Sequence, residues 1–263
     1  MTSGDRFTHR AGSRLAIDGA SIYYEVIGRG DGPPLVMLHG GFGTMEDFNS
    51  ILPGLDGPFS IIGIDSRGHG ASTRGDVPLS YARLQTDVEA LLDSLGLNRC
   101  HLMGFSDGGV VAYRIAAETS VTAESLVTIG SRSQRKDVDE ARKILGGVTA
   151  EGWEEKFPDT VAAYRRLNPE PDFRALVPTV VGMWLDLTGT GYPDEAVGEI
   201  GCPTLVVRGD DDHLVSRRAA VDAVERIPQG HFLSIPFAGH AVHMERPDMF
   251  LLAANHFLEA STS

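Results

Sequence analysis

The sequence has few cysteines and no long apolar run, and both shortages limit what the protein can be. Its two cysteines, Cys100 and Cys202, allow at most one disulfide and lack metal-ligand spacing, so neither a disulfide framework nor a zinc site is expected. No apolar run approaches the ~20 residues that a membrane span needs. Residues 1–14 lack the apolar core of a signal peptide. These absences favour a cytoplasmic protein without a membrane partner.

Basic residues are also in short supply. The chain has 23 Lys and Arg against 36 Asp and Glu, which gives a net charge of −13. Nucleic acids and anionic lipids bind basic surfaces, so both are excluded as expected partners. Solubility accounts for the acidic surface. We expect a small-molecule substrate as the partner, and a chain that is a monomer or a homodimer.

Short apolar runs alternate with amphipathic segments along most of the chain. Residues 35–38 are entirely apolar, as in a strand that is buried on both faces. Residues 80–95 have helical apolar spacing, with Ser80 as N-cap and Gly96 just beyond the end. The other expected strands are 14–18, 21–27, 59–64, 99–103, 125–129, 203–208 and 231–236, and the other expected helices are 110–117, 217–226 and 246–258. This alternation predicts an α/β fold with a mostly parallel sheet and helices on both faces.

The alternation stops between residues 130 and 200. Here the chain is first charged and then rich in aromatic residues and methionine, and 158–167 and 178–187 are expected to be helices. The apolar residues that share one face of the second helix are Leu176, Val180, Met183, Trp184 and Leu187. We therefore expect residues 131–199 to form a small helical cap insertion on a core made of 1–130 and 200–263.

The strongest motif is Gly104-Phe105-Ser106-Asp107-Gly108-Gly109, which lies between an expected strand and an expected helix. A nucleophile elbow needs this context, because the sharp turn strains the central serine and leaves room only for small neighbours. The serine hydroxyl then lies at a helix N-terminus, which favours a developing anion. By its pattern alone, the motif is equally compatible with a glycine-rich turn that contains an incidental serine.

A serine nucleophile needs a base, and the base needs an acid that orients it. Gly209-Asp210-Asp211-Asp212 and Gly239-His240 each follow an expected strand. Ligands of open α/β sheets bind at these carboxyl ends of the strands. The order of Ser106, an aspartate and then His240 is also the chain order of a triad on such a sheet. Together the three elements indicate nucleophilic catalysis.

From about Leu15 to Leu258 the sequence resembles the serine-type α/β-hydrolase family. The motifs that carry the resemblance are His39–Gly43, Asp65–Gly70, the elbow, Gly209–Ser216 and Gly239-His240. The likeness implies an α/β-hydrolase fold with an eight-stranded sheet, Ser106 as nucleophile and His240 as base. In this family the acid usually lies three residues after the strand-end glycine, which implies Asp212. Asp211 is the alternative acid, whereas Asp210 is expected to form hydrogen bonds within its own loop.

The resemblance also implies an oxyanion hole and no cofactor or metal. One N–H donor would be the amide of Asp107, and the second would come from Gly41 or Phe42, between which the sequence does not decide. His243, three residues after His240, is a weak metal-ligand candidate, because the H-E-x-x-H arrangement is missing. We expect no metal at this loop.

Substrate binding is less constrained by the sequence. The Ser-Asp-Gly-Gly elbow resembles the branch that includes valacyclovir hydrolase, which cleaves α-amino-acid esters, so the Asp107 carboxylate is a candidate partner for a substrate ammonium. The alternative is that Asp107 caps the following helix. Trp153 and Trp184 are candidate pocket residues, although cap aromatics more often form core.

The expected function is therefore that of a serine hydrolase for a small carboxylic ester, thioester or amide. Serine at the elbow excludes the branches of the family that use an aspartate nucleophile. Two alternatives stay open. The same triad supports C–C bond hydrolysis and perhydrolysis, and the same fold hosts ligand receptors with little catalysis.

Overall fold

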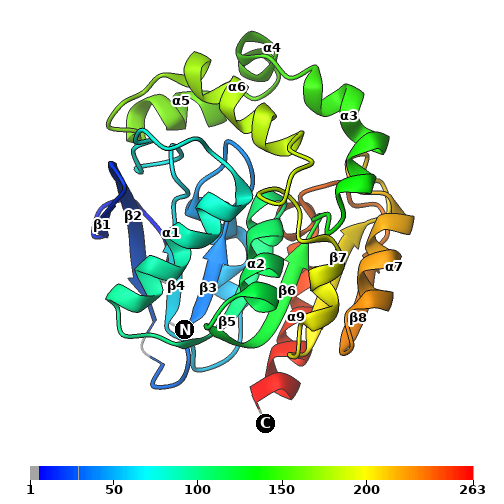
Figure 1. The fold of residues 1–263 in the computed structure, drawn as a ribbon. Coiled ribbons are helices and arrows are strands. Elements are labelled where there is room, and N and C mark those ends of the chain that lie inside the picture. The colour runs from blue at the N-terminus through cyan, green and yellow to red at the C-terminus, as the bar shows by residue number, and fades with distance from the viewer. Residues whose placement is uncertain (1–5, 29, 263) are drawn as a thin grey trace.

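The computed structural model describes residues 6–28 and 30–262, and within them the chain forms one sheet of eight strands (Figure 1). The strands are β1 (Ser13–Ile17), β2 (Ala20–Ile27), β3 (Leu35–Leu38), β4 (Ile61–Ile64), β5 (Arg99–Phe105), β6 (Thr122–Ile129), β7 (Thr204–Gly209) and β8 (Gly230–Ile235). Their order across the sheet is β1-β2-β4-β3-β5-β6-β7-β8. The hairpin β1–β2 pairs antiparallel, β2 also pairs antiparallel with β4, and all pairs from β4 to β8 are parallel. The predicted fold class is confirmed.

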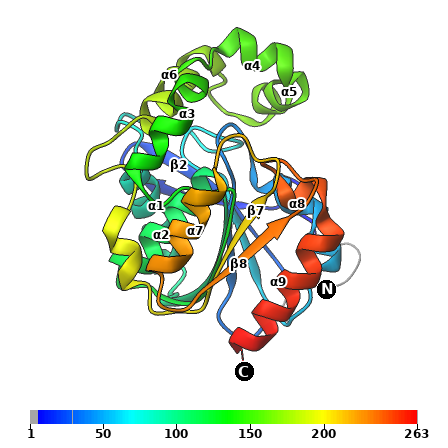
Figure 2. The ribbon, with the colours of Figure 1, turned by 90° about the vertical axis from the view of Figure 1, so that its right-hand side faces the viewer.

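Helices cover both faces of the sheet, as expected. The α-helices are α1 (Tyr81–Ser94), α2 (Asp107–Glu118), α3 (Val138–Gly146), α4 (Ala150–Lys156), α5 (Pro158–Leu167), α6 (Phe173–Trp184), α7 (Arg217–Arg226), α8 (Val242–Glu245) and α9 (Pro247–Thr262), and the 3-10 helices are η1 (Met45–Ser50), η2 (Leu52–Gly54), η3 (Arg135–Asp137) and η4 (Asp194–Glu199). Figure 2 shows α1, α2 and α7 on one face and α8 and α9 on the other. Among the described helices none has the length and apolarity to cross a bilayer.

Strand β3 shows why the expected apolar run is apolar throughout. Val36 and Leu38 pack into the core on the α1–α2 face, whereas Leu35 and Met37 pack into the core under η1 and α9. Successive side chains of a strand point to opposite faces, so a strand that is covered on both sides needs apolar residues at every position.

The residues predicted to begin and end α1 do so. The Ser80 hydroxyl accepts a hydrogen bond from the Arg83 amide, and Gly96 adopts a φ of +70° just beyond the helix. Helix α5 and helix α7 also have the expected bounds. The strand expected from residue 59 begins at Ile61, and the terminal helix reaches Thr262.

Two helix starts were predicted wrongly. The helix expected at 178–187 is α6, which begins at Phe173 because the Asp172 carboxylate caps it by accepting from the Ala175 amide. Pro178 lies inside this helix, and Leu187 lies outside it and is 38% exposed. The helix expected from Val110 already begins at Asp107, because the chain enters α2 directly after Ser106. Gly108 and Gly109 are therefore part of the helix, where both are closely packed against neighbouring residues.

Between β6 and β7 the chain forms η3, α3, α4, α5, α6 and η4. Helices α3 to α6 lie across the carboxyl ends of the strands, at the top of Figures 1 and 2. Four of the residues predicted to share one helix face are buried, namely Leu176, Val180, Met183 and Trp184. Helices α3 and α4 had no counterpart among the predicted elements. This helical segment therefore stands over the strand ends where the predicted site residues lie.

Candidate active site

Ser106 occupies the tight turn between β5 and α2. Its backbone has φ +51° and ψ −113°, a conformation that a serine rarely adopts. A Cβ on Gly104 would lie 2.3 Å from the Gly108 carbonyl oxygen, and a Cβ on Gly108 would lie 1.9 Å from the Leu38 carbonyl oxygen. Both positions therefore require glycine, which explains the G-x-S-x-G pattern sterically.

The loops after β7 and β8 bring Asp212 and His240 to this serine. His240 Nε2 lies 3.1 Å from Ser106 Oγ, and His240 Nδ1 lies 3.0 Å from Asp212 Oδ2. Asp211 is exposed. Asp210 accepts hydrogen bonds from Arg217 at the start of α7 and from Ser234 of β8, and not, as expected, within its own loop. Of the two candidate acids, Asp212 is thus the one that contacts the histidine.

The surroundings of Asp212 keep it ionised. Burial acts to raise its pKa, but the hydrogen bond and charge of His240, together with the amides of Val215 and Leu214, lower the pKa overall. Those amides donate to Asp212 Oδ1 at 3.0 and 2.8 Å. Because an ionised carboxylate only accepts, His240 Nδ1 carries the proton and Nε2 can accept from the Ser106 hydroxyl.

Gly41 and Phe42 lie on the loop that follows β3. A Cβ on Gly41 would lie 2.7 Å from both Asp107 Oδ2 and Trp184 Cζ2, so this position has room only for glycine. Phe42 is buried and has a φ of +61°. Either amide can still serve as the second oxyanion donor, and the two remain alternatives.

His39 anchors the start of this loop. Its Nδ1 donates to the Gly40 carbonyl at 2.7 Å, and its Nε2 accepts from the Ser66 amide at 2.9 Å. Burial and the neighbouring His69 lower the pKa of His39 to about 4. His39 is therefore neutral and contributes geometry, not positive charge, beside the proposed oxyanion hole.

Asp107 has partners that the sequence did not reveal. Its Oδ1 accepts from the Tyr81 hydroxyl at 2.8 Å, and Trp184 Nε1 donates to Oδ1 and Oδ2 at 2.9 and 2.8 Å. The side chain thus packs between α1 and α6. Burial raises the pKa of Asp107, and the hydrogen bonds from Trp184 and Tyr81 oppose this only in part.

The aromatic residues of the insertion gather on Phe42. The ring of Phe42 lies 4.7 Å from that of Trp153, 5.3 Å from that of Phe173 and 5.4 Å from that of Trp184, measured between centroids. Both tryptophans that were predicted to contact substrate therefore lie next to the loop that carries Gly41 and Phe42.

Ser131, two residues after the end of β6, also contacts the elbow, although it was not identified from the sequence as a site residue. Its hydroxyl donates to the Ser106 carbonyl at 2.9 Å, and a Cβ on Gly109 would meet the same hydroxyl at 1.9 Å. Its position directly after a strand-end glycine was a signal that could have identified it.

The weak metal candidate at His243 is explained by packing. His243 is fully buried, and its ring lies 4.7 Å from that of Phe105 and 5.3 Å from that of Phe48. Neither ring nitrogen has a hydrogen-bond partner within the described ranges, and burial lowers its pKa to about 3. Among all the residues that the structure describes, no group of three or more His, Cys, Asp or Glu side chains is arranged to hold a metal.

Comparisons with known proteins show the family to which the chain belongs. Residues 35–253 match the model of the alpha/beta hydrolase family. The chain is 27% identical over 236 residues to the esterase YbfF of Escherichia coli strain K12, which covers 86% of this chain and 92% of the relative.

Two further relatives extend the comparison. Identity to the 2-hydroxy-6-oxo-6-(2'-aminophenyl)hexa-2,4-dienoic acid hydrolase of Metapseudomonas resinovorans is 24% over 250 residues, covering 87% of this chain and 85% of the relative. The crystal structure of a hydrolase from Pseudomonas aeruginosa matches with a TM-score of 0.75 and 26% identity, over 95% of this chain and 99% of that one. The chain belongs to the alpha/beta hydrolase family.

Proposed function

We propose that this protein hydrolyses small carboxylic esters through an acyl-enzyme on Ser106. One observation carries the proposal: Asp212, His240 and Ser106 are joined in series by contacts of 3.0 and 3.1 Å. A relative named as an esterase, with 27% identity, supports the same class of reaction. No cofactor enters the scheme.

In the first half of the reaction, Ser106 Oγ attacks the ester carbonyl carbon while His240 Nε2 takes the hydroxyl proton. Asp212 holds the imidazole in the required tautomer and stabilises the imidazolium. The carbonyl oxygen becomes negative and accepts from the amide of Asp107 and from that of Gly41 or Phe42. Each such donor contributes on the order of 3 kcal/mol to the transition state.

In the second half, His240 returns the proton to the leaving alcohol as the C–O bond breaks, and the acyl group stays on Ser106. Water then attacks the acyl carbon, and His240 accepts one of its protons. Collapse of this intermediate releases the carboxylic acid and returns the proton to Ser106 Oγ. The same residues therefore perform both halves.

The insertion at 131–199 is proposed to cap the site and to select the substrate. Trp153, Phe173 and Trp184 pack against the ring of Phe42, whose amide is one of the two alternatives for the second oxyanion donor. Aromatic walls with few polar groups suit an apolar acyl or alcohol group. A small apolar ester is therefore the first substrate to test.

A preference for α-amino-acid esters is a finer proposal that depends on Asp107. Asp107 is 6% exposed as a residue, and its carboxylate lies beside Gly41 and accepts hydrogen bonds from the neutral donors of Tyr81 and Trp184. A substrate ammonium would supply the positive charge that these neutral donors lack. The alternative was that Asp107 caps α2. Its described hydrogen bonds come instead from Tyr81 of α1 and Trp184 of α6.

The nucleophile is tested with Ser106→Ala against Ser94→Ala, which changes the last residue of α1. With a p-nitrophenyl ester, Ser106→Ala should lower kcat by about 10⁴-fold or more, whereas Ser94→Ala should leave it unchanged. Full activity in a folded Ser106→Ala protein would overturn the proposal. Product analysis with a diketone, or with peroxide and a carboxylic acid, distinguishes C–C hydrolysis and perhydrolysis on the same triad.

The amino-ester preference is tested with an α-amino ester and its des-amino analogue. The parent should favour the amino ester by about tenfold in kcat/KM, and Asp107→Asn should remove that ratio. An unchanged ratio in Asp107→Asn would eliminate the ammonium contact while leaving the esterase proposal intact.

A further inference from the structure

The segment before β1 is firmly attached to the body of the protein. Phe7 is buried, its amide donates to Asn49 Oδ1, and its carbonyl accepts from Asn49 Nδ2. The amides of Thr8 and Arg10 donate to the two carboxylate oxygens of Glu25 at 2.9 and 3.0 Å. These contacts place His9, which lies between Thr8 and Arg10, at a defined position.

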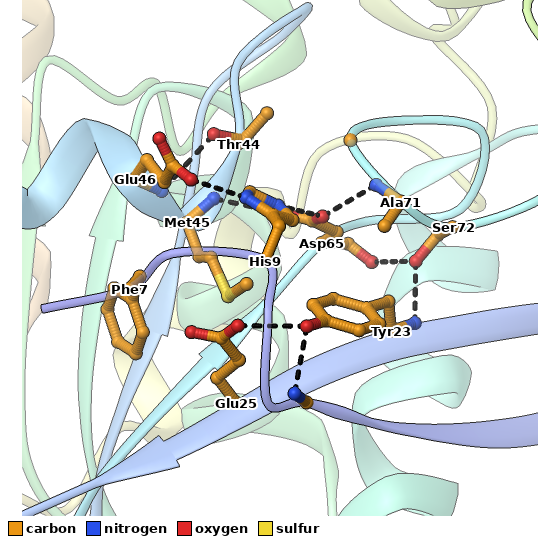
Figure 3. Close-up of polar contacts among 12 residues, drawn as sticks. Phe7, His9, Tyr23, Glu25, Thr44, Met45, Glu46, Asp65, Ala71 and Ser72 are labelled. Atoms are coloured by element: carbon orange, nitrogen blue, oxygen red, sulfur yellow. Dashed lines mark hydrogen bonds and ion pairs between the residues drawn. The ribbon is translucent and has the colours of Figure 1, made fainter. Parts of the chain in front are cut away.

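His9 bridges two carboxylates (Figure 3). Its Nδ1 lies 2.6 Å from Glu46 Oε1, and its Nε2 lies 2.6 Å from Asp65 Oδ2. The His9 side chain is 2% exposed, and its ring stacks on that of Tyr23 at 5.5 Å. Ionised carboxylates only accept hydrogen bonds, so both ring nitrogens must donate, and His9 is an imidazolium.

The bridge is next to the loop that holds the proposed oxyanion donors. At the start of that loop, His39 Nε2 accepts from the Ser66 amide, and at its end the Met45 amide donates to Asp65 Oδ1 at 3.0 Å. Gly41 and Phe42 lie between these two anchors. The geometry of the loop therefore depends on how residues 65 and 66 are held.

His9 supports the second anchor from both sides. It binds Glu46, the residue after Met45, and it binds the other oxygen of Asp65, which also accepts from the Ala71 amide at 2.7 Å. Without the imidazolium, two carboxylates would face each other close to Met45 and would repel.

We propose that His9 is a positioning residue for the hydrolysis proposed above. Its bridge between Glu46 and Asp65 fixes the end of the loop that carries Gly41 and Phe42, and thereby the second N–H donor of the oxyanion hole. The inference rests on the proposed function and adds a residue more than 90 positions from the nucleophile in the chain.

Titratable and charged groups surround His9 on every side. They are Glu46 and Asp47 from η1, Asp65 after β4, Tyr23 and Glu25 from β2, and Arg14, which lies over the Tyr23 ring. Burial lowers the pKa of His9, but Asp65 and Glu46 raise it overall to about 9. Burial raises the pKa of Asp47 to about 7, and burial with Glu25 raises that of Tyr23 to about 12. His9 is therefore the group in this cluster that titrates near pH 9.

The test compares His9→Gln and Glu46→Gln with His256→Gln, a matched change of an exposed histidine on α9. His9→Gln should lower kcat for the ester by about tenfold and change KM by less than about twofold, because the donor is displaced while the pocket remains. The rate at which a fluorophosphonate labels Ser106 should fall by a similar factor. His256→Gln should change neither rate.

The pH profile separates positioning from mere structural support. The parent should lose kcat above a midpoint near pH 9, and circular dichroism should show that it stays folded there. Glu46→Gln keeps an oxygen acceptor but removes one negative charge, so its midpoint should move to lower pH. His9→Gln should have no such limb.

Each outcome has a distinct meaning. If the parent is labelled at Ser106 but folded His9→Gln is labelled equally fast, the role of His9 is overturned and the proposed function stands. If His9→Gln does not fold, an unmoved alkaline midpoint in Glu46→Gln overturns the role. If the parent neither hydrolyses esters nor reacts with the fluorophosphonate, the proposed function itself fails.

Discussion

Two buried histidines pack against the short helix η1, and their surroundings differ completely. His9 meets Glu46 of η1 and the Asp65 carboxylate, each at 2.6 Å. His243 meets the ring of Phe48 of η1 and that of Phe105, and neither of its nitrogens has a partner in the part of the chain that the structure describes. The pKa of His9 is raised to about 9 and that of His243 is lowered to about 3.

The difference shows that the partners, and not burial alone, decide the charge of an interior histidine. Burial acts to lower the pKa of both residues. Two carboxylates outweigh it at His9, whereas the aromatic rings around His243 offer no compensation. One histidine thus serves as a fixed cation and the other as a core residue.

The most direct way to break this comparison is to replace each histidine by leucine. His9→Leu leaves Asp65 buried without its cation and should lower the free energy of unfolding by about 3–5 kcal/mol. His243→Leu removes no hydrogen bond from the described contacts and should change it by less than about 1.5 kcal/mol. Urea unfolding of both variants measures the difference. Equal losses would show that the two sites are energetically alike.

A second prediction concerns the pH dependence of stability. His243 and His39 have lowered pKa values in the fold, about 3 and about 4, so the stability that these two residues contribute is full above the ordinary histidine value of ~6.5 and falls as the pH drops toward 3 to 4. His9 has a raised pKa, so its contribution is full below ~6.5 and is lost as the pH rises through about 9.

At ~1.4 kcal/mol per pKa unit, His243 and His39 together should contribute about 6 kcal/mol to the acid limb by pH 4, and His9 about 3 kcal/mol to the alkaline limb. Urea titrations between pH 4 and pH 10 would measure both limbs. His243→Leu should weaken only the acid limb, and His9→Leu should remove only the alkaline one. A His9→Leu protein that keeps the alkaline limb would assign that limb to another group.

The smallest expected effect is that of Tyr23→Phe, which tests whether the Tyr23 hydroxyl contributes to the charge of His9. The Tyr23 hydroxyl donates to Glu25 Oε1 at 2.8 Å and accepts from the Gly12 amide at 2.9 Å. Tyr23→Phe keeps the ring that stacks on His9 and should cost about 1 kcal/mol of stability. The alkaline midpoint of kcat should stay in place. A moved midpoint would show that the hydroxyl, and not the two carboxylates, sets the charge of His9.

The fold and the contact among Ser106, Asp212 and His240 follow from local signals in the sequence. A nucleophile elbow requires glycine at positions where a Cβ would lie too close to a carbonyl oxygen. The base and the acid must lie directly after parallel strands. Those constraints act within a few residues, so a single sequence shows them. The family match over residues 35–253 agrees with the fold class.

The contacts around the site depend on pairs that are distant in the chain, and for that reason the sequence did not reveal them. Asp107 meets Tyr81 across 26 positions and Trp184 across 77. His9 meets Glu46 across 37 positions and Asp65 across 56. No periodicity or motif links such residues. The start of α6 was predicted wrongly for a local reason. The helix was expected to begin at Pro178, but the Asp172 side chain caps it five residues earlier, at Phe173.

The hydrogen bond from Trp184 to Asp107 has a practical consequence for any redesign of the proposed substrate site. A smaller residue at position 184 would leave room beside Phe42, and it would also withdraw an N–H donor from the buried Asp107, which is next to Ser106. Volume and charge are therefore coupled at this position. Engineering for bulkier esters should pair any change at Trp184 with one at Asp107.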